Sequence, residues 1–238
     1  MNLVPQTCCS QPAANSRPRA FTLIELLVVI SIIGVLAALI FPVAGSVSRV
    51  KKINTAQAEL NDIELALENY KAKYGTYPPS NPANTITNGL FYELTGVTND
   101  LADNYYIPLD GSPYVKVNDY FLEFGVGGVV NSTKASGDET VYAKDFLPGL
   151  KATQIASTTN GTGSTFFYLV TSVGGPDLTY QPLNGVSGNP FRYKYPGTNN
   201  PNSYDLWVQL SINSKPNAKH TYLICNWSQQ PLLNNPLP

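Results

Sequence analysis

The sequence predicts an α+β fold in which one long N-terminal helix packs against an antiparallel sheet in the C-terminal part of the chain. Three observations predict this fold. An uncharged apolar run extends from Leu26 to Val43, and apolar residues continue beyond it at steps of three and four as far as Tyr74. After residue 164, several segments are rich in β-branched and aromatic residues and are bounded by Gly, Pro and Asn, as strands commonly are.

Residues 21–44 are long and apolar enough to form a membrane-spanning helix, because ~20 helical residues cover the ~30 Å of a hydrocarbon core. One acidic residue, Glu25, lies near the start of the run. Three interpretations are open: a secretory signal peptide with Arg17 and Arg19 as its basic region, a plain signal anchor in which Glu25 has no role, or a segment cleaved just before the apolar run. The signal peptide fits poorly because its apolar region is usually only ~7–15 residues long.

The third interpretation is favoured by the stretch Ala20-Phe21-Thr22-Leu23-Ile24-Glu25 ahead of the long apolar run. This stretch resembles the class III leader junction of type IV pilins and type II secretion pseudopilins. The resemblance implies that residues 1–20 are a leader, that cleavage falls between Ala20 and Phe21, and that the new amine of Phe21 is N-methylated. The family usually has Gly before the cut, so Ala20 implies slower processing at worst. Pro42 stands where these helices commonly carry a kinking proline.

Physical reasoning gives Glu25 a role in assembly. An ionisable side chain within a membrane helix costs several kcal/mol unless it is paired, and it marks function by default. The amine created at Phe21 is a cation that lies only about 6 Å away along the axis of one helix. In a filament of staggered subunits, the amine of one helix can meet Glu25 of its neighbour, and this pair would fix the register of assembly.

Residues 45–75 are predicted to continue the helix as an amphipathic segment. The apolar positions of this segment are Val47, Val50, Ile53, Ala56, Leu60, Ile63, Leu67, Tyr70 and Tyr74. Pro42 is expected to kink the helix and Gly75 to end it. The basic residues Arg49, Lys51 and Lys52 follow the apolar run, and we expect them on a solvated helix face, with contact to lipid headgroups as the alternative.

Residues 76–163 are predicted to form a loop-rich αβ connection. The stretch "YGTYPPS" turns the chain, because Gly75 permits positive φ and Pro78-Pro79 forbid further helix. Tyr-Gly-x-Tyr-Pro after a long helix also resembles the major pseudopilin. Beyond it the chain is rich in Asn, Thr, Gly and Ser, with an apolar island at 89–94 that predicts a short helix. The connection is longer than that family needs, so we interpret it as an insertion.

Residues 164–238 are predicted to form an antiparallel sheet and a C-terminal tail. The expected strands are 165–173, 189–196, 204–212 and 221–227. Alternation in two of these strands indicates one buried face, whose natural partner is the apolar stripe of the helix. "NPFRYKYPG" followed by "YDLW" also resembles the terminal hairpin of the pseudopilin, so the expected architecture is a pilin-like ladle.

The sequence contains no catalytic constellation, metal cluster or cofactor motif that we recognise. His220 is the only histidine, and Cys225 has no basic cluster nearby in sequence to lower its pKa, so we expect structural roles for both. Cys8 and Cys9 belong to the expected leader, which leaves the mature chain without an intramolecular disulfide. A net charge of −1 gives no basic surface for nucleic acid.

The resemblance implies a structural subunit, not an enzyme. It is expected to form a helical homo-oligomeric filament that supports protein export, with a single-pass anchor in the inner membrane and the C-terminal domain in the periplasm. The implied partners are prepilin peptidase, an inner-membrane assembly platform, minor pseudopilins and membrane lipid, with no nucleic acid and no cofactor. The alternatives are a type IV or competence pilin subunit and, in a different class, a membrane-anchored periplasmic binding module or enzyme.

Calcium is a further point on which the sequence can be compared with the family, since the major pseudopilins bind this ion in a loop near their C-terminus. Calcium requires six to eight oxygen ligands, with carboxylates among them. Here no Asp or Glu follows Asp205, and Asp177 could approach it only if their loops converge. We therefore expect no metal site, and a Pro/Asn-rich hairpin in place of the loop.

Overall fold

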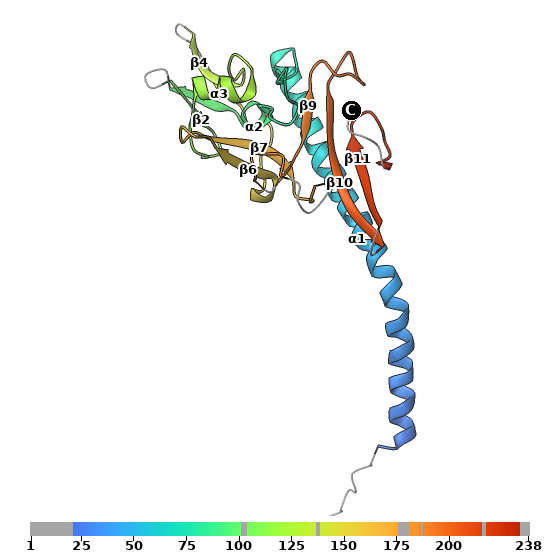
Figure 1. Ribbon diagram of the computed structural model, residues 1–238. Coiled ribbons are helices and arrows are strands. Elements are labelled where there is room, and N and C mark those ends of the chain that lie inside the picture. Colours follow the sequence, from blue (N-terminus) through green and yellow to red (C-terminus); the bar gives the residue numbers. More distant parts are fainter. Residues whose placement is uncertain are drawn as a thin grey trace, which may run out of the picture. The chain divides into compact units, whose positions relative to one another are not determined.

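The computed structural model describes residues 21–238 except 101–103, 137–138, 176–180, 187, 216–217 and 234–238, and it describes no side chains at 39–46, 135–139 or 211–220. Several residues singled out from the sequence therefore lie outside the described part: Ala20 with the rest of the leader, Asp177, and the side chains of Pro42 and His220. The chain divides into two compact units, Met1–Ala44 and Gly45–Pro238. Figure 1 shows its elements in sequence colours.

Helix α1 comprises Leu23–Tyr74, and it ends as predicted just before Gly75, whose φ of +79° is left-handed. In the second unit α1 buries one face. The residues of this face that are buried are Ala56, Leu60, Ile63, Ala66, Leu67 and Tyr70, and they join the main hydrophobic core. These positions recur at steps of three and four, which confirms the amphipathic pattern over this part of the helix.

The pattern is wrong at its N-terminal end. Val47 and Val50 were expected on the buried stripe, but they are 59% and 48% exposed. A step of three residues falls about 60° short of a full helical turn. Three such steps from Val47 lead to Ala56 on the opposite side of the helix, so only the later residues face the core. Val47 and Val50 therefore present apolar surface to the outside of the second unit.

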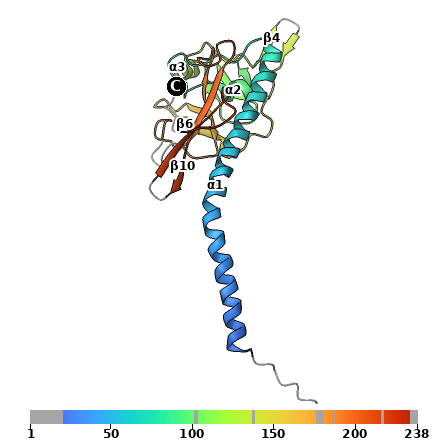
Figure 2. The same cartoon turned by 90° about the vertical axis from the view of Figure 1, so that its right-hand side faces the viewer.

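The C-terminal sheet contains β9 (Arg192–Lys194), β10 (Asp205–Lys215), β11 (Ala218–Cys225) and β12 (Leu232–Leu233), all antiparallel, in the order β12-β11-β10-β9. Figures 1 and 2 show β10 beside the C-terminal part of α1. The inner side chains of the sheet, Leu206, Val208 and Leu210, are buried in the same core as the α1 stripe. This confirms the expected packing of helix on sheet.

The remaining predicted strand is also present, in a second, three-stranded sheet. Strand β7 (Thr165–Thr171) pairs with β6 (Ile155–Thr159) on one side and with β8 (Asn189–Pro190) on the other. The predicted strand 189–196 is thus divided into β8 and β9, which belong to different sheets.

The connection has more regular structure than the sequence predicted. The expected short helix is α2 (Leu90–Thr95), and a second helix, α3 (Val117–Phe124), follows. The connection also contains a five-stranded sheet in the order β3-β2-β1-β4-β5. Its strands are β1 (Val97–Asp100), β2 (Tyr105–Pro108), β3 (Val115–Lys116), β4 (Ser132–Ser136) and β5 (Glu139–Val141), and the turn η1 (Ala152–Gln154) precedes β6. Strands as short as these carry too little alternation for a pattern to reveal them.

Candidate assembly site at the start of α1

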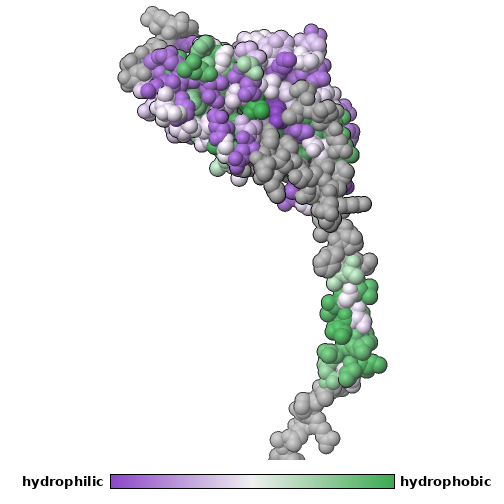
Figure 3. All heavy atoms as spheres, in the orientation of Figure 1, coloured by the Kyte–Doolittle hydropathy of each residue, from purple (hydrophilic) through white to green (hydrophobic). Residues whose placement is uncertain are grey.

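The first part of α1 is apolar on all sides. Every side chain from Phe21 to Leu36 is exposed, with exposed fractions of 75% at Phe21 and 69% at Ile24. Figure 3 shows this segment as a column of mostly green, hydrophobic residues. A helix of a soluble domain usually hides one apolar stripe, whereas apolar residues all around a helix need lipid or other helices as cover. This segment therefore has the surface of an anchoring or assembling helix.

Glu25 lies in the first turn of α1 and forms a capping box with Thr22. Its Oε2 accepts hydrogen bonds from the Thr22 backbone N–H at 2.9 Å and from the Thr22 hydroxyl at 2.7 Å. In return, the backbone N–H of Glu25 donates to the Thr22 Oγ1 at 3.3 Å. These bonds satisfy donors that the start of a helix otherwise leaves unpaired. The Thr-x-x-Glu spacing ahead of an apolar run is a readable signature of this box, which the sequence prediction missed.

The capping box leaves part of the carboxylate available. Both hydrogen bonds from Thr22 reach Oε2, and within the described part of the chain no donor reaches Oε1. The other hydroxyl in this segment, on Ser31, donates to the carbonyl of Leu27 at 2.7 Å. Glu25 is therefore the one acidic side chain of the segment, held in one orientation with an oxygen open to a cation.

Within the described residues, no helix is both long and apolar enough to cross a membrane. The predicted span, 21–44, extends into residues 39–46, whose side chains are outside the described part. The predicted kink at Pro42 lies there too and stays a prediction.

The structural role expected for Cys225 is confirmed. The thiol is on β11, is 2% exposed and packs in a small cluster with Trp207 and Leu223. Burial raises the pKa of the Cys225 thiol, which disfavours a reactive thiolate. The part of the chain that is described contains no group of three or more His, Cys, Asp or Glu placed to hold a metal ion.

The carboxylate of Asp205 accepts hydrogen bonds from its own loop. The residue is 1% exposed, and its carboxylate accepts hydrogen bonds from the backbone N–H groups of Thr198, Asn199 and Asn200 at 2.7, 2.8 and 3.0 Å. A Cβ on Gly197 would lie 2.6 Å from Oδ1 of Asp205, so this loop needs glycine there to close around the carboxylate. Beyond it the chain forms the β10–β11 hairpin, as the sequence predicted.

Comparison with known proteins places these features in context. Residues 15–41 match the family model described as a prokaryotic N-terminal methylation motif. This segment is therefore similar to an N-terminal methylation motif. It covers Ala20, Phe21 and Glu25 and ends just before Pro42. The roles predicted for these residues agree with the motif but are not tested by it.

Two relatives are similar to this chain over a longer stretch than the methylation motif. The chain is 41% identical over 58 residues to the type II secretion system core protein G of Pseudomonas aeruginosa, which covers 24% of this chain and 41% of the relative. It is 41% identical over 69 residues to the protein of the same name from Escherichia coli, which covers 29% and 47%. The chain thus spans less than half the length of these curated relatives. No solved structure is significantly similar to it.

Proposed function

We propose that this chain is a structural subunit of a type II secretion pseudopilus, matured by prepilin peptidase and polymerised through its N-terminal helix to support protein export. The observation that carries the proposal is a match to a methylation motif, with Glu25 in the first turn of a helix whose first part, as far as Leu36, is apolar on every side. The relatives named type II secretion system core protein G favour secretion over a type IV or competence pilus. A monomeric anchored binding module or enzyme would need neither the cleavage nor Glu25.

Maturation supplies the charge that assembly uses. Hydrolysis of the peptide bond between Ala20 and Phe21 leaves an amine on Phe21, which is N-methylated and remains cationic. Two of the bonds of the capping box fix Oε2 of Glu25 toward Thr22 and leave Oε1 toward the surroundings. The amine of a neighbouring subunit is the cation that suits this position, because an unpaired carboxylate in an apolar environment is costly. Assembly thereby neutralises two charges at once.

In this proposal the chain is anchored in the inner membrane by residues 21–44, with the second unit in the periplasm. Prepilin peptidase, an inner-membrane assembly platform, minor pseudopilins, membrane lipid and further copies of the chain are its partners. The apolar surface from Phe21 to Leu36 is what lipid covers before assembly and what neighbouring helices cover afterwards.

The test is the mass of the mature protein purified from membranes of cells that contain prepilin peptidase. We expect an N-terminus at Phe21 that carries an added methyl group. The matched variant Ala20→Gly restores the residue that the family usually has and should be processed at least as fast. A chain that retains Met1, or one that begins at Gly45, would contradict the proposal.

A further inference from the structure

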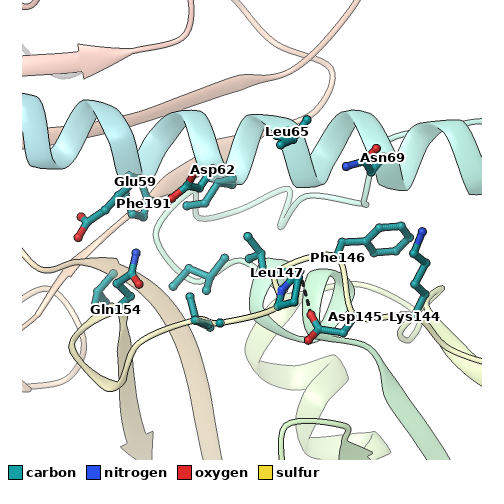
Figure 4. Close-up of a pocket in the computed structure, with 16 residues that line it drawn as sticks. Glu59, Asp62, Leu65, Asn69, Lys144, Asp145, Phe146, Leu147, Gln154 and Phe191 are labelled. Carbon is teal, nitrogen blue, oxygen red and sulfur yellow. Dashed lines mark hydrogen bonds between the residues drawn. The ribbon is translucent and has the colours of Figure 1, made fainter.

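A groove of about 430 Å³ lies beside α1 in the second unit. Asp62, Leu65 and Asn69 of α1 line one side, and the segment 144–150 lines the other. Figure 4 shows the two walls facing each other, with Glu59 and Gln154 at one end. The second wall belongs to the insertion, for which the proposed function gives no role.

The groove carries a net negative charge. Three of its side chains are acidic, Glu59, Asp62 and Asp145, against one lysine, Lys144. Glu59 is buried and accepts hydrogen bonds from Thr171 and Ser172.

Of the other charged side chains, Asp145 and Lys144 have contacts within the domain, whereas Asp62 has no partner in the described part of the chain. Asp145 accepts a bond from the backbone N–H of Leu147 at 2.8 Å, and the Lys144 ammonium lies 5.2 Å from the centre of the Phe146 ring. Asp62 is exposed and has no hydrogen bond or ion pair with the described part of the chain. A cation that enters the groove would therefore meet Asp62.

The same helix carries a complementary surface closer to its N-terminus. Its exposed stripe is defined here as Val47, Val50, Lys51, Asn54 and Ala58. With about 100° of rotation per residue, these five side chains fall within one side of α1. Lys51 is the only charged residue among them, because Lys52 points about 100° away. The stripe is thus apolar and small, with one long cationic side chain.

We infer that the groove receives the exposed stripe of a second copy of this chain, with Lys51 of the neighbour beside Asp62. The match is one of charge, between the one cation of the stripe and the exposed carboxylate of the groove. A parallel copy shifted by eleven residues, about 16 Å along the axis, brings its Lys51 level with Asp62 and its Val47 level with Ala58.

The interface can repeat without closing. The α1 side chains that line the groove are centred roughly 80° around the helix axis from the centre of the exposed stripe; they are Glu59, Asp62, Ile63, Leu65 and Asn69. One copy can therefore offer its stripe to a neighbour and receive the stripe of another at the same time. Such a heterologous contact generates a filament when it does not close on itself.

This inference rests on the proposed function, and its test separates the two. The full-length chain with Lys51→Cys and Asp62→Cys is expressed with prepilin peptidase, oxidised in membranes and compared with the matched pair Lys52→Cys and Asp62→Cys. Cys225 is buried and serves as an internal background. We expect a ladder of disulfide-linked oligomers from the 51–62 pair and none above background from the 52–62 pair.

An amine-reactive crosslinker applied to the unmodified chain reports assembly itself. A crosslinked ladder without a 51–62 disulfide ladder would overturn the groove interface and leave the filament standing. No ladder of either kind would overturn both. Equal ladders from the two cysteine pairs would show contact without the inferred register and would also refute the interface.

Charge reversal tests the pairing of Lys51 with Asp62. Lys51→Asp and Asp62→Lys, each alone, place like charges together and should lower the yield of the crosslinked ladder at least about tenfold. The double variant restores the opposite charges and should recover most of the yield, which also shows that the variants fold. Lys52→Asp makes the same charge change one residue away and should leave the yield unchanged. Failure of the double variant to recover the ladder would refute the pairing.

Discussion

Glu93 offers the sharpest test of how the second unit is stabilised. This residue of α2 is completely buried, yet it carries a carboxylate. Oε1 accepts a hydrogen bond from the backbone N–H of Val130 at 2.9 Å, and Oε2 accepts from the backbone N–H of Asn131 at 3.0 Å and from the hydroxyl of Tyr70 at 2.9 Å. The carboxylate therefore joins α1 to the segment that follows α3. The variant Glu93→Gln keeps the size of the side chain and removes its charge.

The expected loss in free energy of unfolding follows from these hydrogen-bond donors. In the Glu93→Gln variant, the amide nitrogen of the new side chain would have to face either the N–H of Val130 or that of Asn131, so one buried backbone donor loses its acceptor. An unsatisfied buried donor costs about 1–3 kcal/mol. We expect the free energy of unfolding of residues 46–238 to fall by about that amount near pH 4. Urea denaturation followed by tryptophan fluorescence measures it, and Asp62→Asn, which alters an exposed carboxylate, is the matched control.

The direction of the Glu93 pKa shift determines how the free energy of unfolding changes with pH. Burial raises the pKa of Glu93 above its ordinary value of 4.5, although the backbone and Tyr70 hydrogen bonds oppose this. The stabilisation linked to a raised pKa is fully present below the unfolded pKa and is lost as the pH rises through the folded pKa. The wild-type chain should thus lose about 1.4 kcal/mol per pH unit relative to Glu93→Gln above pH 4.5, until the folded pKa is passed. If the difference in free energy of unfolding between the wild-type chain and Glu93→Gln widens with rising pH, this reasoning is refuted.

Three further outcomes are expected. Glu25→Ala should leave membrane insertion intact and weaken the crosslinked ladder, because it deletes the partner of the neighbouring amine; an unchanged ladder would remove Glu25 from the mechanism. Millimolar calcium should not raise the thermal midpoint of residues 46–238, whereas a site filled at about 100 times its dissociation constant would add ~2.7 kcal/mol and several degrees. Asp205→Ala should lower the free energy of unfolding by roughly 3 kcal/mol, since it strands the buried N–H donors of its loop, and equal urea midpoints would contradict that role.

The parts of the fold that could be predicted are those with long, regular patterns. Strand β10 alternates buried Leu206, Val208 and Leu210 with other residues, and α1 repeats its buried positions over several turns. The pattern failed at Val47 because steps of three alone drift around a helix. The strands of the connection could not be predicted because each is too short to show a repeating pattern. Periodicity reports which face is buried, and it needs several repeats to do so.

The candidate site divides in the same way. The Thr22–Glu25 box is local, and its spacing was available in the sequence. The environment of Glu93 was not available, because its donors come from residues 23 to 38 positions away in the chain. The one local hint is a carboxylate inside the apolar island Leu90–Leu94. The groove beside α1 has the same character, because one wall comes from the helix and the other from the distant segment 144–150.

The buried network around Glu93 also positions the wall of the groove. Asn131, whose backbone N–H donates to Glu93, exchanges side-chain hydrogen bonds with the backbone of Lys144 at 2.6 and 2.9 Å. Its Oδ1 also accepts from the Tyr74 hydroxyl at 2.7 Å, and the N–H of Phe146 donates to the carbonyl of Leu94 at 2.7 Å. The wall is therefore fixed to α1 and α2 at its first residues. A filament built through this groove would depend on Glu93, although that residue touches neither Lys51 nor Asp62.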